Sequence, residues 1–205
     1  MVEYDEKLAE EWYERKSALM EEMLGKEHDL VMHSIIPYAM GGQLDLYYYP
    51  NGIPGTAIAT KELSELPGEG SSNRVFRSYE LVMFTKHPLD LDAVKDETTP
   101  FGRAHRTINA ILNVVGPYSA EETLNPNETC EFPPDMPDVG GRCLVLDGYP
   151  SYSEDEPAEF GLMVLIEVFR SEMEYARENG TANLLMRLKD KGYYPYSDLD
   201  RQPVA

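Results

Sequence analysis

The chain has 205 residues, of which 37 are acidic and 18 are basic, so its formal net charge is −19. Its hydrophobic fraction of 42% is enough to build a core, which excludes a wholly disordered protein, and its length fits one globular domain or at most two small ones. Nucleic acids and anionic membranes carry the same sign of charge, so neither is expected as a partner, whereas a basic partner is allowed but not required.

The first predicted element is a helix within residues 1–27. Leu8, Trp12, Leu19 and Met23 recur at steps of four, seven and four, which places them on one helix face. The remaining positions are rich in Glu, Lys and Arg, as a solvated face requires. A glycine follows at position 25, where we expect the helix to end.

Two extended segments follow, and their spacing predicts a hairpin. Residues 44–49 are rich in tyrosine, a proline–asparagine–glycine turn ends this strand, and residues 55–60 form its antiparallel partner. Because side chains alternate across a strand, Tyr47 and Tyr49 should share one face and Tyr48 the other. Tyrosine suits both the edge of a core and a binding surface, and the sequence favours neither.

The middle of the chain is predicted to hold a strand at residues 79–85 and then a long helix. Thr99 and Pro100 have the chemistry of an N-cap and a first helical position. Gly116 and Pro117 are expected to end this helix. Its apolar stripe, which we expect to be buried, consists of Phe101, His105, Ile108, Leu112 and Val115.

Two further strands are predicted in the second half of the chain, at residues 143–147 and 162–169. The later one is apolar on both faces apart from Glu167, which is typical of an interior strand. Glu80 interrupts the strand at 79–85 in the same way. A buried acid is costly unless it is paired. Each acid therefore lies either on an exposed strand face or beside an arginine, for which the candidates are Arg74, Arg77, Arg103, Arg106 and Arg170.

The C-terminal region is predicted to form two short helices and a tail. The sequence Ser171–Glu174 has the pattern of a capping box, which marks a helix start. This helix breaks near Gly180, and Thr181 is placed to cap a second helix that ends at Gly192. Residues 193–205 contain two prolines and form an irregular tail.

This order of elements predicts an α+β fold. No βαβ alternation runs through the chain, so we expect a single domain over residues 1–205 with a central, mixed or mostly antiparallel sheet flanked by helices. Residues 119–160 stand apart, with 11 acidic residues, one basic residue and six prolines. We expect a long, solvated, semi-rigid excursion there, around one short strand. It serves either as a plain solvated loop or as a surface for a basic partner.

Sequence motifs for catalysis do not occur in the chain. It has no glycine loop for phosphates or dinucleotides, no nucleophile elbow and no two-histidine zinc motif. His28 and His33 are five residues apart, which directs them away from a common face. Acidic neighbours of Cys130 disfavour a reactive thiolate, and two cysteines alone cannot complete a zinc site. We therefore expect no catalytic residue, no cofactor and no metal.

Cysteine content and the N-terminal sequence favour the cytoplasm. Cys130 and Cys143 do not make a disulfide framework, and a reduced pair is typical of a cytosolic protein. The first six residues are acidic and lack the apolar stretch of a signal peptide. The longest apolar run, residues 162–166, is too short for a membrane span.

Several segments of the sequence share an order and spacing that is moderately specific. They are Leu44–Pro50, Tyr79–Met83, Gly116–Tyr118, Asn125–Pro126, Cys143–Leu146, Leu165–Ala176 and Tyr194–Arg201. Together they resemble the suppressor of fused domain family, especially its bacterial single-domain members. The resemblance implies an α+β domain with a central sheet, and binding rather than catalysis. Animal members are two-domain cytoplasmic inhibitors that sequester a transcription factor, and bacterial members are often placed among immunity proteins that neutralise polymorphic toxins.

The leading hypothesis is therefore a non-catalytic, cytoplasmic protein-binding module. The resemblance extends it to an immunity-type inhibitor of a basic toxin domain. The candidate partner-binding surface is acidic and aromatic and consists of Asp147, Tyr149, Tyr152, Glu154, Asp155, Glu156 and Glu159. One alternative is a carboxylate- or metal-dependent hydrolase, in which a histidine would meet Glu or Asp. The other is a self-assembling structural protein, a homo-oligomer joined through the tyrosine-rich strand.

Overall fold

The computed structural model describes the backbone of residues 2–205 and the side chains from residue 6 onward. Within this range the chain forms one seven-stranded sheet, four α-helices and a short 3-10 helix. The strands are β1 (Val31–Met32), β2 (Leu46–Tyr49), β3 (Thr56–Ala59), β4 (Tyr79–Thr85), β5 (Thr129–Glu131), β6 (Cys143–Tyr149) and β7 (Gly161–Val168). The helices are α1 (Val2–Leu24), α2 (Pro100–Glu121), α3 (Arg170–Asn179), α4 (Thr181–Asp190) and the 3-10 helix Tyr38–Met40.

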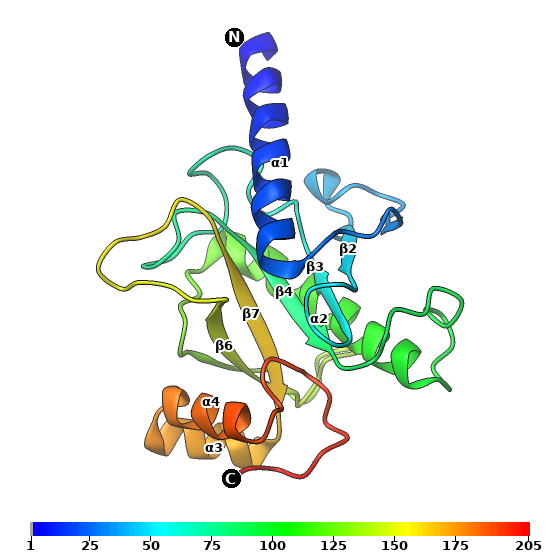
Figure 1. The fold of residues 1–205 in the computed structure, drawn as a ribbon, viewed down its shortest axis with the longest axis vertical. Coiled ribbons are helices and arrows are strands. Elements are labelled where there is room, and N and C mark those ends of the chain that lie inside the picture. Colours follow the sequence, from blue (N-terminus) through cyan, green and yellow to red (C-terminus); the bar gives the residue numbers. More distant parts are fainter. Residues whose placement is uncertain (1) are drawn as a thin grey trace.

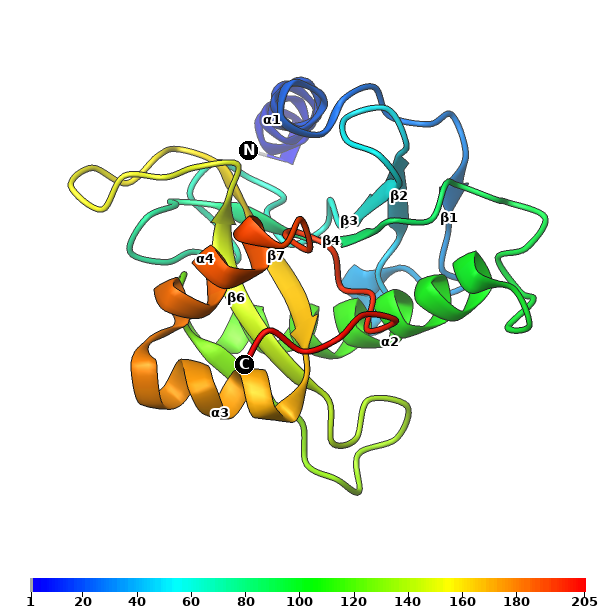
Figure 2. The same ribbon diagram turned by 60° about the horizontal axis from the view of Figure 1, so that its bottom comes forward.

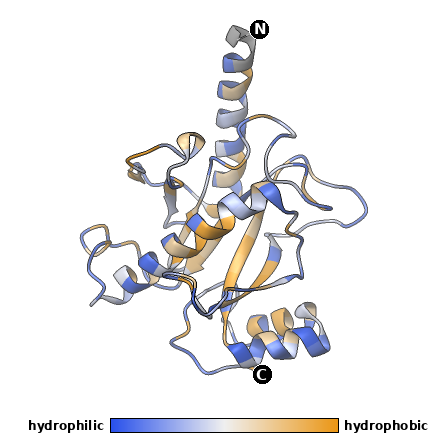
Figure 3. Cartoon of the chain, turned by 180° about the vertical axis from the view of Figure 1, so that it is seen from behind, coloured by the Kyte–Doolittle hydropathy of each residue, from blue (hydrophilic) through white to orange (hydrophobic). Residues whose placement is uncertain are grey.

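The sheet is the middle layer of the fold (Figures 1 and 2). Its strand order is β1-β2-β3-β4-β7-β6-β5, and neighbouring strands are antiparallel except for β4 and β7, which run parallel. Helices α1, α3 and α4 pack on one face, and α2 crosses the other (Figure 3). The predicted α+β fold with a mixed sheet is thus confirmed. No helix among residues 2–205 has both the length and the apolar character that crossing a membrane requires.

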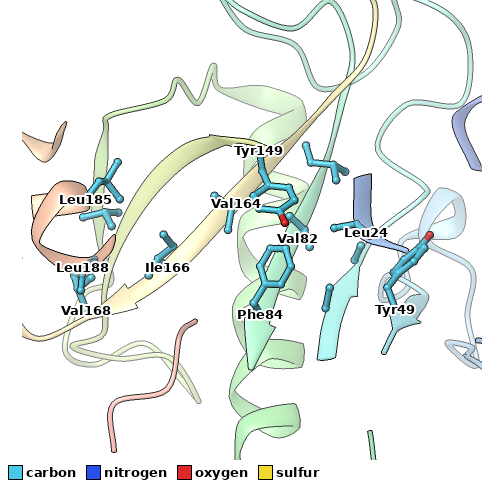
Figure 4. Close-up of a cluster of buried hydrophobic side chains, with 14 of the residues drawn as sticks. Leu24, Tyr49, Val82, Phe84, Tyr149, Val164, Ile166, Val168, Leu185 and Leu188 are labelled. Atoms are coloured by element: carbon cyan, nitrogen blue, oxygen red, sulfur yellow. The ribbon is translucent and has the colours of Figure 1, made fainter. Parts of the chain in front are cut away.

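Side-chain alternation divides the core into two clusters, one on each side of the sheet. Tyr47 and Tyr49 belong to the cluster under α1, α3 and α4, part of which Figure 4 shows, and Tyr48 belongs to the cluster under α2. This confirms the predicted alternation. All four residues of β2 are buried, and β2 lies between β1 and β3. The tyrosine-rich strand is therefore a core element, without an exposed face for the dimer contact considered above.

Helix α1 packs on the sheet through a stripe that differs from the predicted one. Its buried residues recur at every fourth position and are Trp12, Lys16, Met20 and Leu24. Of the predicted stripe, Trp12 is buried, and Leu19 and Met23 are partly buried and pack against the same core cluster. Lys16 lies outside the predicted stripe, because a lysine seldom occupies a buried position. The helix ends at Leu24, and Gly25 follows with φ of 82°. A Cβ atom on Gly25 would lie 2.6 Å from the backbone nitrogen of Gly52, so this close approach requires glycine.

Helix α2 begins as predicted but ends later. The Thr99 hydroxyl oxygen accepts a hydrogen bond from the Gly102 N–H at 3.0 Å, and the whole predicted stripe is buried. The helix continues past Gly116 and Pro117 to Glu121, so the predicted end is wrong. Proline lacks only its own N–H, and one missing bond near the end of a long, buried helix does not stop it.

The N-cap residues of the two C-terminal helices differ from the predicted ones, Ser171 and Thr181. The α3 cap is Phe169, and its N–H donates to Glu172 Oε2 at 2.9 Å, so the capping acid is Glu172 and not Glu174. Thr181 is the first helical residue of α4, and Gly180, with φ of 92°, occupies the cap position. Helix α3 therefore begins two residues, and α4 one residue, before the predicted start.

The acidic segment 119–160 and the tail are more firmly packed than the sequence indicates. The segment holds the end of α2, two paired strands and the buried side chains of Leu124, Phe132 and Val139. The tail 193–205 forms neither helix nor strand. It is nevertheless attached to the sheet, since the Ser197 N–H donates to the Phe84 carbonyl oxygen at 2.8 Å.

Candidate functional site

Two of the seven predicted surface residues lie on β6 and are buried. Asp147 is 5% exposed, accepts a hydrogen bond from the Tyr194 hydroxyl at 3.1 Å and lies 3.8 Å from the Lys189 ammonium. Burial raises the pKa of Asp147, and Lys189 partly opposes this. Tyr149 packs its ring 4.9 Å from that of Phe84, as Figure 4 shows. Pairing of β6 with β7 turns both side chains into the core.

Tyr152 lies at the base of the segment between β6 and β7 and is half-buried. Its ring packs edge-on against Phe76, with 6.3 Å between the ring centroids, and its hydroxyl accepts from the Asn127 side chain at 2.9 Å. The ring also covers Gly148, where a Cβ atom would lie 2.3 Å from the Tyr152 ring. Tyr152 thus fixes the base of this segment and leaves only part of its surface free for contact.

The other four predicted residues are exposed on residues 150–160, which we call the acidic loop. It projects from the body between β6 and β7 (Figure 1). Glu154 pairs with Arg74 at 3.4 Å, and Glu159 pairs with Arg15 of α1. Asp155 and Glu156 are exposed and pair with no cation among the described residues. The structure thus brings the exposed acids together and separates them from Asp147 and Tyr149.

The two acids within apolar strands are both buried and paired, though with none of the five arginines considered. Glu80 is fully buried and lies 3.0 Å from the ammonium of Lys16 on α1. Its carboxylate also accepts from the Thr60 hydroxyl at 2.7 Å. Glu167 lies 2.6 Å from Arg142, and burial raises its pKa while Arg142 lowers it. The alternative of an exposed strand face is wrong for both.

Titratable groups elsewhere do not converge on a metal or nucleophile site. Among the side chains described from residue 6 onward, no three His, Cys, Asp or Glu groups come together in a way that could hold a metal. His33 meets Asp45 at 2.6 Å and His87 lies 3.4 Å from Asp198, but neither pair belongs to such a group of three among these side chains. Burial raises the pKa values of both Cys130 and Cys143, which disfavours a thiolate at either position.

One open cleft lies where β4 and β7 end. Its volume is about 280 Å³, and α2 and the tail complete its walls. The ionisable side chains that line it are His87, Arg103, Arg142, Glu167, Asp198 and Asp200. No sequence pattern indicates this cleft, because its walls come from five segments that are distant in sequence.

Comparisons with known proteins identify the fold. No described family and no curated protein matches the sequence. Solved structures do match, including the following two. One, described as the Sufu–Fu complex crystal structure, aligns over 96% of this chain and 92% of its own, with a TM-score of 0.59 and 17% identity. The other, the crystal structure of Drosophila Suppressor of Fused, aligns over 83% of this chain and 46% of its own, with a TM-score of 0.54 and 19% identity.

The chain therefore has a Suppressor of Fused-like fold, as the sequence resemblance implied. It matches less than half of the Drosophila chain's length.

Proposed function

We propose that this chain is a non-catalytic protein-binding module that recognises a basic partner through its acidic loop. The observation that carries the proposal is the group of exposed carboxylates on this projecting loop, of which Asp155 and Glu156 have no cationic partner among the described residues. A Suppressor of Fused-like fold supports it, because one matched structure is a complex of Sufu with Fu.

Electrostatics favours fast and selective encounter with such a partner. A net charge of −19 attracts a basic protein over a distance and repels acidic ones. Each exposed ion pair contributes only about 0.2–1 kcal/mol, so specificity also requires apolar contact. Tyr152, at the base of the acidic loop, supplies a partly exposed ring for this. In its finer form, the proposal is a cytoplasmic, immunity-type inhibitor of a basic toxin domain such as a nuclease.

The experiment is affinity capture from the source organism with the purified chain, at low and high salt. Raising the salt from about 0.1 M to about 1 M shortens the Debye length from about 10 Å to about 3 Å, so a charge-selected partner should be released. Co-expression with a toxin encoded next to this gene tests the finer form, since an inhibitor should restore growth.

A matched pair of variants locates the contact. E154Q/D155N/E156Q removes three charges from the acidic loop, and E174Q/E178Q/D190N removes three exposed charges from α3 and α4. The loop variant should lose the captured protein, and the control should retain it. Capture of no protein at low ionic strength, or equal loss with both variants, would contradict the proposal.

A further inference from the structure

A groove runs along α1 where the helix meets residues 26–29, Tyr47 and residues 61–65. It consists of two hollows of about 490 and 500 Å³, and both are lined by Tyr13 and Lys61. Tyr13 is 44% exposed, although it is a large aromatic side chain, and it stands where the two hollows meet. Sequence analysis missed this groove because Tyr13 lies on the charged face of the helix.

The chain already places one cation of its own against this ring. The Lys61 ammonium lies 5.1 Å from the centroid of Tyr13 and 4.7 Å from that of Tyr47. The ammonium also donates to the Ser17 hydroxyl oxygen at 2.9 Å and pairs with Glu27. Lys61 thus shows what the groove offers to a cation, namely the faces of tyrosine rings together with carboxylate oxygens.

The walls of the groove carry more negative than positive charge. Seven carboxylates line the two hollows, against three ammonium groups. Two of those ammonium groups, Lys16 and Lys61, are buried and paired with Glu80 and Glu27. The carboxylates of the walls are those of Glu10, Glu14, Glu21, Glu27, Asp29, Glu62 and Glu65. A second cation entering the groove would therefore meet an aromatic ring and carboxylates that the internal lysines do not neutralise.

We propose that this groove receives a lysine or arginine side chain from a basic segment of the partner protein, with the cation held beside Tyr13. The inference rests on the proposed function, because it names a second contact of the same basic partner. The two surfaces lie on opposite sides of α1, since Arg15, which pairs with Glu159 of the acidic loop, points away from Tyr13, two residues before it on the helix. A segment that crosses α1 can contact both. A second copy of this chain fits poorly, because it brings the same negative charge.

The test uses an oligo-arginine peptide as the probe, and titration calorimetry at about 150 mM ionic strength, where charges beyond about 8 Å are screened. Tyr13→Ala should weaken binding about two- to five-fold, the range expected for an exposed cation–π contact. Tyr13→Phe keeps the ring and should bind like the native chain. The matched control is Tyr118→Ala, which removes another exposed tyrosine from a helix and should change nothing.

Two further measurements separate the groove from the loop and from misfolding. Amide shifts of the native chain should move at Tyr13 and Glu65 when the peptide is added. E10Q/E65Q leaves the ring intact and should also weaken binding. The proposed binding of a cation in this groove would be overturned if the native chain and Tyr13→Ala bound the peptide equally, or if the peptide did not bind at all. The capture experiment tests the proposed function separately, because it compares variants of the acidic loop and leaves Tyr13 unchanged.

Discussion

Acidification should destabilise the fold through His105. This side chain lies on α2, is 2% exposed, and its Nε2 is 2.8 Å from the Tyr48 hydroxyl oxygen. Phe101 packs against it, with 6.0 Å between the ring centroids. Burial lowers the pKa of His105 from its ordinary value of 6.5 to about 4, because the charged imidazolium loses its water. The folded chain therefore keeps a neutral histidine at a pH where the unfolded chain binds a proton.

The sign and size of the effect follow from this difference. Well above pH 6.5 the imidazole is neutral in both states, so His105 adds no pH dependence to the free energy of unfolding. Between pH 6.5 and pH 4 only the unfolded state is protonated, so stability falls as the pH falls. At about 1.36 kcal/mol for each pKa unit, the full loss is about 3 kcal/mol, of which about 2 kcal/mol is reached by pH 5.

Urea unfolding at pH 7 and pH 5, followed by the fluorescence of the single tryptophan, measures this loss. His105→Gln removes the titrating group. Between pH 7 and pH 5, the free energy of unfolding of this variant should therefore fall by about 2 kcal/mol less than that of the native chain. Buried acids with raised pKa values, such as Asp147 and Glu167, shift stability in the opposite direction, but they do so in both proteins. Equal pH dependence in the two proteins would refute the assignment.

Three buried polar contacts give further predictions, each read by urea unfolding. Ser197→Ala should lower the free energy of unfolding by about 1–3 kcal/mol, because this hydroxyl donates to the Leu165 carbonyl oxygen at 3.1 Å and accepts from the Glu167 N–H at 3.2 Å. An unchanged free energy of unfolding would contradict that role. Lys16→Met should cost about 3–5 kcal/mol by leaving Glu80 without its cation, whereas Lys7→Met, an exposed change on the same helix, should cost less than about 1 kcal/mol. Arg201→Lys should be destabilising although it keeps the charge, because Arg201 binds Glu172 through two nitrogens at 2.6 and 2.9 Å, and unchanged stability would show that the paired geometry is not needed.

Much of the fold follows from local chemistry and could be predicted. The turn after Tyr49 and the alternation of the tyrosines locate the β2–β3 hairpin, whose strands do pair antiparallel. Thr99 and Pro100 locate the start of α2, and the spacing of its apolar residues locates its buried face. These features depend on residues close together in sequence, so periodicity and capping rules are sufficient.

The predictions that failed concern features that depend on contacts between residues distant in sequence. The stripe of α1 includes Lys16, whose burial makes sense only once Glu80 lies beneath it, 64 residues later. Helix α2 passes Pro117, and its last turn is held by the Ser119 hydroxyl, which lies 2.8 Å from that of Ser71, a contact that no local rule predicts. Burial of Asp147 follows from the pairing of β6 with β7. Four acids of the candidate surface, within residues 154–159, are exposed, whereas strand pairing buries the fifth, Asp147.

Buried ion pairs explain how the two ends of this acidic chain find their places. Lys16 joins α1 to β4 through Glu80, and Arg201 joins the tail to α3 through Glu172. An apolar contact can be satisfied by many side chains, but a buried carboxylate is costly unless a cation reaches it with the right geometry. With 18 basic residues against 37 acidic ones, few cations are free to compete for each buried acid. These pairs therefore select which segment docks at which position, while most of the remaining carboxylates stay on the surface, where they set the charge that a partner meets.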